Sequence, residues 1–298
     1  MYLNNSEFIL GTVIPPILVL IGVISNIFII IVYSRKKFKS LATKNIWRLI
    51  ALVDIFCVLQ IIKHFATNTF NYNMYLISPI TCKLLCYFSH FSSISAWLLV
   101  YISIERLLSI TCPQFNKCLQ NVQIILITFV ILVNLSFYLQ RFLYNGLIVH
   151  ETQNFSYCGV IKKYKIAFDV FSWMDLLIGT LIPFAMMLIC SVLLIKTIYI
   201  ARKRIIHSST AAVKRKIKRD IKFCITLVFL DVKFVVLNLP INIYFLDKNW
   251  SNHICFLVFD DLFYLSFSVN FFVYLAVNSE FRYEFVSIFY NRKSEYSY

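Results

Sequence analysis

Charged residues are scarce in this sequence. Asp, Glu, Lys and Arg make up 14% of its 298 residues, whereas hydrophobic types make up 60%. So few charges could not cover so much apolar surface in water, which argues against a soluble globular protein and for an integral membrane protein. Acidic residues are fewer than basic ones, 14 against 29. The resulting charge of +15 is explained by basic loops beside anionic lipid, without nucleic-acid binding.

The signatures of membrane enzymes are also missing. Neither H-E-x-x-H nor G-x-S-x-G occurs, and the five histidines lack metal-ligand spacing. The sequence also lacks the repeated halves, broken helices and lines of pore-facing charges that a transporter or channel would need. We therefore expect no enzymatic activity and retain a multi-span transporter as a remote alternative.

Long hydrophobic segments are abundant. A transmembrane helix needs about 20 mainly apolar residues, and the sequence predicts an all-α bundle of seven such helices, in one domain covering 1–298. The predicted segments are 8–34, 47–62, 84–109, 122–140, 170–196, 223–246 and 254–277. The first is too long for a signal-peptide core and lacks a positive N-terminal flank, so we expect it to be retained.

Lys and Arg concentrate in alternate loops: between the first and second segments, between the fifth and sixth, and after the seventh. The positive-inside rule makes these loops cytoplasmic. We therefore expect an extracellular N-terminus of residues 1–7 and a cytoplasmic C-terminus in the plasma membrane. Three N-x-S/T sequons fall on the predicted outer side, at Asn4, Asn154 and Asn249, and are candidate glycosylation sites. A fourth, at Asn134, lies mid-span and out of reach.

The nine cysteines do not indicate a disulfide-rich secreted fold. Five lie within spans or on the cytoplasmic side, where they should stay reduced. Cys82, at the outer top of the third segment, and Cys158, in the second outer loop, lie where oxidation is allowed and can form a bridge. Cys86 and Cys255 are also near the outer face, so the pairing is not unique.

Several motifs follow the seven segments in order. They are G-V-I-S-N with Asn26, L-I-A-L-V-D with Asp54, Glu105-Arg106 closing the third segment, L-I-P-F with Pro183, F-V-V-L-N-L-P with Phe234 and Pro240, and N-F-F-V-Y with Asn270 and Tyr274. In this order and spacing the chain resembles the rhodopsin-like (class A) G-protein-coupled receptors over about residues 22–285. Invertebrate peptide-receptor branches, including FMRFamide-receptor-like ones, look similar.

The sequence departs from the family pattern at switch positions. Leu107 replaces the tyrosine of D/E-R-Y, Asn238 replaces the hinge tryptophan of the sixth span, and Phe271 replaces the proline of N-P-x-x-Y. These changes leave the expected fold intact and alter the residues that build the family's activation switch.

The resemblance implies an activation switch at the inner end of the bundle. In the closed state Arg106 would pair with Glu105 and Asp220, and on activation it would leave them to contact a heterotrimeric G protein. Arrestin and the lipid bilayer are further implied partners. Pro240, Asn270 and Tyr274 belong to the same switch. A simple interfacial charge pair, formed by an arginine that extends to the interface, is the alternative.

The resemblance also places an allosteric sodium ion beside Asp54, and no other cofactor is expected. The residues implied to line the ion are Ser95, Ser266 and Asn270. Their oxygens suit a hard cation, and a protonated Asp54 in a polar network is the alternative. Lys233, in the inner half of the sixth span, complicates this expectation. If it points inward it could pair with Asp54 or Asp231 and displace sodium. A charge in the apolar layer between the third and sixth spans would also raise basal activity.

Polar and aromatic residues in the outer half are the ligand-binding candidates. They are Lys63, His64, Phe88, Arg141, Asp175, Tyr244, Asp260, Asp261 and Tyr264. Phe88 stands where amine receptors carry an aspartate, and Tyr264 where opsins carry the retinal lysine, so the resemblance favours neither class. The mixed charges, with Lys162, Lys163 and Lys165 in the second outer loop, favour a peptide ligand and a neuropeptide receptor. A small-molecule or chemosensory ligand is the alternative.

After the seventh span, residues 279–298 are predicted to form a cytoplasmic amphipathic helix and tail. Phe281, Phe285, Ile288 and Phe289 share one helical face, while Arg282 and Glu284 are expected to face elsewhere.

Overall fold

The computed structural model describes residues 5–38, 43–150, 155–208, 211–246 and 252–290, although the side chains of residues 113, 116, 150, 155, 198, 201–221, 223 and 246 are outside its description. The described chain is almost entirely helical. The helices are α1 Asn5–Phe8, α2 Ile14–Tyr33, α3 Lys44–Leu59, α4 Ile62–Phe70, α5 Pro79–Phe88, α6 Ser92–Thr111, α7 Pro113–Asn121, α8 Gln123–Tyr144, α9 Lys165–Asp175, α10 Ile182–Ser208, α11 Ala211–Leu246, α12 His253–Ser268, α13 Asn270–Val277 and α14 Ser279–Phe289. Two strands, β1 Asn145–His150 and β2 Phe155–Val160, form an antiparallel hairpin.

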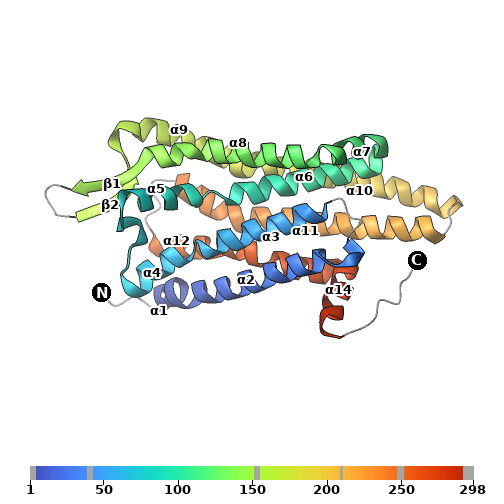
Figure 1. Ribbon diagram of the computed structural model, residues 1–298, viewed down its shortest axis with the longest axis horizontal. Helices are drawn as coiled ribbons and strands as arrows, with labels where there is room; N and C mark the ends of the chain where they lie inside the picture. Colours follow the sequence, from blue (N-terminus) through green and yellow to red (C-terminus); the bar gives the residue numbers. More distant parts are fainter. Residues whose placement is uncertain (1–4, 39–42, 151–154, 209–210, 247–251, 291–298) are drawn as a thin grey trace.

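The described helices provide seven spans. Six are long and apolar enough to cross a membrane, and the seventh is the pair α12 and α13, bent by 49°. The six are Asn5–Tyr33, Lys44–Phe70, Pro79–Thr111, Gln123–Tyr144, Lys162–Thr197 and Cys224–Phe245. In Figure 1 they run side by side along the long axis, with the hairpin at one end and α7 and α14 at the other. This confirms the predicted seven-helix bundle.

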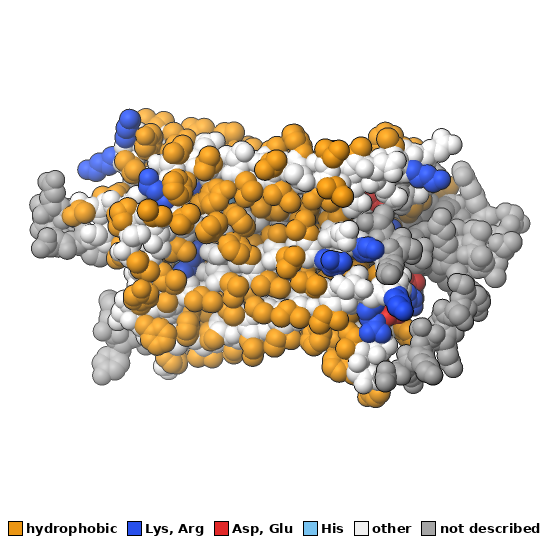
Figure 2. Space-filling view, in the orientation of Figure 1, with side chains coloured by type: hydrophobic (Ala, Val, Ile, Leu, Met, Phe, Trp, Pro, Cys, Tyr) orange, Lys and Arg blue, Asp and Glu red, His pale blue; other side chains and the backbone are white. Residues whose placement is uncertain are grey.

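The outside of the bundle is apolar. Ile124 is 80% exposed and many other large hydrophobic side chains also face outward. Figure 2 shows hydrophobic side chains across the middle of the visible face, with Lys and Arg mainly toward its two ends. Such a surface would be costly in water but is matched by lipid, and the helices satisfy their own backbone groups there.

Three spans are interrupted in their outer halves. The second breaks between α3 and α4 at Gln60 and Ile61, and the third breaks between α5 and α6 at residues 89–91. In the fifth, the π-helical segment Leu176–Leu181 separates α9 from α10. π-Helical turns are frequent at functional sites, and polar residues beside all three interruptions line the cavity described below.

The hairpin is fastened to the third span by a disulfide between Cys82 and Cys158. The sequence predicted that this pair can form a bridge, but it did not exclude other pairings of the outer cysteines. Cys86, one helical turn after Cys82, places its Sγ 3.8 Å from Cys158 Sγ. The three sulfur atoms therefore form one cluster at the outer end of the bundle.

At the opposite end, α14 packs beneath the bundle through Phe281, which is fully buried and contacts the rings of Tyr33 and Tyr274. The expectation that Glu284 lies off the apolar, buried face of this helix is wrong. Glu284 is buried, and its carboxylate forms an ion pair of 2.8 Å with Arg35 of the first inner loop. The loop supplies a compensating guanidinium that helical periodicity alone does not reveal.

Several predicted features fall outside the described part of the chain. These are the sequons at Asn4, Asn154 and Asn249 and the side chain of Asp220, whose backbone lies in α11. The fourth sequon is described: Asn134 is buried, and its Oδ1 accepts a hydrogen bond of 2.8 Å from Ser93 Oγ. It is therefore part of the helix packing.

Candidate functional site

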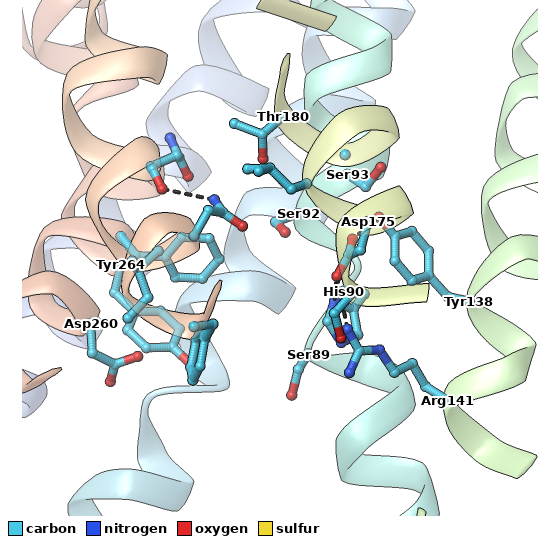
Figure 3. A pocket seen from close by; sticks show the side chains of 18 of the residues that line it. Ser89, His90, Ser92, Ser93, Tyr138, Arg141, Asp175, Thr180, Asp260 and Tyr264 are labelled. Carbon is cyan, nitrogen blue, oxygen red and sulfur yellow. Dashed lines mark hydrogen bonds and ion pairs between the residues drawn. The ribbon is translucent and has the colours of Figure 1, made fainter. Parts of the chain in front are cut away.

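The outer half of the bundle encloses a cavity of about 360 Å³, here called the outer cavity. Its walls come from α4, the break between α5 and α6, α8, α9 with the π-helical segment, α11 and α12. The volume falls in the range of small-molecule pockets, about 300–1,000 Å³. Figure 3 shows polar side chains from several of these elements directed toward a common space.

Six of the nine predicted ligand-binding residues line the outer cavity: Lys63, His64, Arg141, Asp175, Asp260 and Tyr264. The others do not line it. The Phe88 ring packs against Phe91 at 5.3 Å, and the Tyr244 ring packs against Phe256 at 5.7 Å. Asp261 is next to Asp260 but on a different side of α12, because successive helical residues point about 100° apart. Both aspartates lie about two turns into α12 and not at its start.

One wall of the outer cavity carries a charge cluster centred on Asp175, both of whose carboxylate oxygens have partners. Its Oδ1 accepts a hydrogen bond of 2.7 Å from Tyr138 Oη. Its Oδ2 accepts from Arg141 Nη2 at 3.0 Å and lies 3.3 Å from His90 Nδ1. The guanidinium also lies over the ring of Phe171, 4.9 Å from its centroid. These contacts join α5–α6, α8 and α9 and neutralise the aspartate within the protein.

The other side carries two charges that are not joined. Lys63, 4% exposed, donates a hydrogen bond of 2.5 Å to Ser89 Oγ and lies over the Tyr75 ring, 5.5 Å from its centroid. Asp260 is 8% exposed, and no hydrogen bond or ion pair to the described residues is found for it. Burial raises the pKa of the Tyr75 phenol, so that group stays protonated. Lys63 and Asp260 therefore face the same cavity as an open pair of opposite charges.

Several lining residues were not predicted from the sequence. They include Ser89, His90, Ser93, Tyr138, Thr180, Asn238 and Asn242. Ser89 and His90 point inward because the third span breaks there, and neither proline nor glycine marks that break. The fifth-span interruption does carry a signal, since Gly179 lies in the π-helical segment and Pro183 follows it.

Asn238 links the cavity to the interior of the bundle. It lines the outer cavity at the position of the missing hinge tryptophan. Its Oδ1 accepts a hydrogen bond of 3.4 Å from Ser266 Oγ, and its Nδ2 donates to the Phe234 carbonyl at 2.8 Å. The first of these bonds crosses from span six to span seven.

Below Asn238 lies an inner network around Asp54, which is completely buried. Asp54 accepts hydrogen bonds from Ser95 Oγ at 2.8 Å and Asn270 Nδ2 at 2.6 Å. Lys233 Nζ donates to the Ser266 carbonyl at 2.7 Å and to Asn270 Oδ1 at 2.8 Å. The ammonium thus takes oxygens that the resemblance assigned to sodium. These residues do not fit a sodium ion while Lys233 is present.

Lys233 binds the backbone at the bend of the seventh span. In a straight helix the Ser266 carbonyl would accept the Asn270 N–H, but here it accepts the ammonium. The helix bends at this point, between Ser268 and Asn270, although Phe271 stands where the family carries proline. Lys233 points toward span seven and not into the layer between spans three and six. Raised basal activity, expected for a charge in that layer, stays a prediction.

At the inner end, the Arg106 side chain is held in place by neighbouring groups. Its Nε lies 3.4 Å from Glu105 Oε2, and its Nη2 donates to Thr43 Oγ1 at 2.8 Å. Glu105 also accepts a bond of 3.4 Å from Gln120. Pro240 lies inside α11, and Tyr274 is buried against the Trp47 ring at 5.3 Å. The arrangement keeps the arginine beside its carboxylate.

Residues 19–289 match the sequence family described as "Serpentine type 7TM GPCR chemoreceptor Srsx". No curated protein matches the chain.

Proposed function

The chain belongs to the Srsx family of serpentine type 7TM GPCR chemoreceptors, and we propose from this premise that it converts binding of a small extracellular molecule into activation of a heterotrimeric G protein. The family is one of receptors and not of enzymes. Its description favours the chemosensory alternative over the expected neuropeptide, and it does not confirm the narrower class A or FMRFamide-receptor-like resemblance. The receptor would lie in the plasma membrane with its N-terminus outside, and arrestin is a further proposed partner.

The observation that carries this proposal is the outer cavity. It is of small-molecule size, and it combines aromatic walls with buried polar groups that can orient a ligand. The lysines that favoured a peptide, Lys162, Lys163 and Lys165, are exposed and do not line it. A ligand in the cavity would therefore contact the charged side chains of the cavity wall and not these three lysines.

Asn238 supplies a physical route from the cavity to the inner end. A ligand that displaces Asn238 would act on Ser266, whose carbonyl Lys233 binds. Lys233 and Asn270 then connect to Asp54. A ligand that binds one arrangement of spans six and seven better than the other would shift the population between them.

The output would come from Arg106. In the closed arrangement its guanidinium is occupied by Glu105 and Thr43. Movement of span six would free the inner cleft, and the arginine would then contact the G protein.

The test is a G-protein activation assay in cells that display the receptor, with panels of small molecules and short peptides. We expect small molecules to activate it, Arg106→Ala to abolish activation, and Asn242→Phe, which fills the cavity, to weaken it strongly. Ile243→Phe is the matched control because Ile243 is 45% exposed on the outer face of the same helix. Activation by peptides alone, unchanged in Asn242→Phe, would contradict the proposal.

A further inference from the structure

The open pair of Lys63 and Asp260 defines the ligand chemistry more narrowly. We propose that the outer cavity binds a small zwitterion, an amino acid or a dipeptide, with its ammonium group at Asp260 and its carboxylate at Lys63. This inference rests on the proposed function, since it names the ligand class of the same site.

The first argument is the contrast between the two walls. Asp175 receives three polar neighbours from within the protein, Tyr138, Arg141 and His90. Asp260 is buried whereas Asp175 is only partly buried, yet Asp260 receives no hydrogen bond from the described residues. A buried carboxylate without donors is costly, so Asp260 is the group that gains most from a ligand N–H donor. Figure 3 places Asp260 across the cavity from Arg141, with Ser89 between them.

The second argument concerns Lys63. Its ammonium has three donors, and Ser89 Oγ accepts one of them. The remaining donors are available to an anionic group, and Lys63 is only 4% exposed. Since Lys63 and Asp260 line one cavity without forming an ion pair, a ligand can be placed between them.

The third argument is charge balance. Lys63 and Arg141 are balanced by Asp260 and Asp175 in the cavity wall. A simple amine at Asp260 would also meet the repulsion of Lys63, and a simple acid at Lys63 would meet that of Asp260. A zwitterion meets an opposite charge at each end and adds no net charge to the cavity.

The aromatic lining supports an apolar side chain on that ligand. The rings that α11 and α12 contribute to the cavity wall include Phe245, Phe256, Phe263 and Tyr264. They can cover an aliphatic or aromatic body, and their faces attract a nearby ammonium.

The test measures thermal stabilisation of the purified full-length receptor by matched probes, because a ligand that binds only the folded state raises Tm. The panel contains the proteinogenic amino acids and dipeptides together with single-charge counterparts. Phenylalanine, for example, is paired with phenethylamine and 3-phenylpropionate, and glycyl-phenylalanine with its end-blocked forms. We expect stabilisation by zwitterions and not by their single-charge or blocked counterparts. Comparing the amino acids with the dipeptides shows which of these two ligand classes the receptor binds.

Charge-removing variants then assign the ends. Asp260→Asn and Lys63→Met should each weaken zwitterion binding at least about tenfold, the factor that 1.4 kcal/mol represents. The two variants should also differ in the single-charge probe that they prefer. Asp260→Asn should bind the acid probe better than the amine, and Lys63→Met should bind the amine better than the acid. The exchange K63D/D260K keeps both charges and should bind zwitterions better than either single variant, which guards against a folding defect.

Asp261→Asn and Lys83→Met are the matched controls, since neither residue lines the cavity, and both should bind as wild type does. The inference is overturned if no zwitterion stabilises the receptor, if uncharged or singly charged probes bind equally well, or if Asp260→Asn changes nothing. Activation by uncharged small molecules in the G-protein assay would then leave the proposed function standing. Failure of every small molecule in that assay would refute both.

Discussion

Replacing Lys233 by alanine should convert a sodium-insensitive receptor into a sodium-sensitive one. The ammonium occupies the Ser266 carbonyl and Asn270 Oδ1, at 2.7 and 2.8 Å. In Lys233→Ala these two oxygens lose their donor and face a vacated space, near the Asp54 carboxylate that Ser95 and Asn270 hold. An all-oxygen site with a full negative charge is what a hard cation requires.

The magnitude follows from the buried charges. Removing one member of a buried ion pair costs about 3–5 kcal/mol, whereas Lys233 and Asp54 are joined only through the Asn270 amide. Asp54 keeps its bonds from Ser95 and Asn270, so we expect the lower end, about 3 kcal/mol, which corresponds to a fall in Tm of roughly 6–12 °C. Sodium at about ten times its dissociation constant would restore about 1.4 kcal/mol by linkage.

The assay is the Tm of the purified receptor in sodium chloride and in choline chloride of equal ionic strength. Wild type should have the same Tm in both salts, whereas Lys233→Ala should be less stable in choline and partly recover in sodium. The double variant K233A/D54N is the control and should not respond to sodium, because it lacks the charge that binds the ion. A wild type that gains as much from sodium as Lys233→Ala, or a variant as stable as wild type in choline, would refute the reasoning.

Three further predictions concern other parts of the molecule. Glu284→Ala should lower the free energy of unfolding by about 1–2 kcal/mol, less than for a fully buried pair because Arg35 is partly exposed. In a thermal-shift assay the exchange R35E/E284R should recover part of this loss. An equal loss of stability in Glu284→Ala and in the exchange variant would count against the ion pair. Cys82→Ala should leave more disulfide-bonded receptor at the cell surface than Cys158→Ala, because Cys86 lies 3.8 Å from Cys158 and can replace Cys82; mass-spectrometric mapping that finds only free thiols in Cys82→Ala would disprove this. An N-terminal epitope should be accessible to antibody on intact cells and a C-terminal epitope only after permeabilisation, since seven crossings put the ends on opposite sides; labelling of both ends on intact cells would exclude the proposed orientation.

The sequence determined the bundle by itself. Seven apolar segments of sufficient length can satisfy their backbone groups in lipid only as helices, so the number of spans follows from composition and length. The resemblance to class A receptors, carried by motifs in the sequence, also implied neighbours that the structure brings together, such as Asp54 with Ser95 and Asn270.

Only the tertiary structure decided what those residues do. Whether Lys233 faces Asp231, span three or span seven depends on the rotation and bend of two helices, and the structure directs it to Ser266 and Asn270. Asp175 and Asp260 are alike in the sequence, yet Asp175 has three polar neighbours, whereas Asp260 faces the outer cavity without a hydrogen-bond donor among the described residues. Partners from distant spans make that difference, and helical periodicity along one segment carries no information about them.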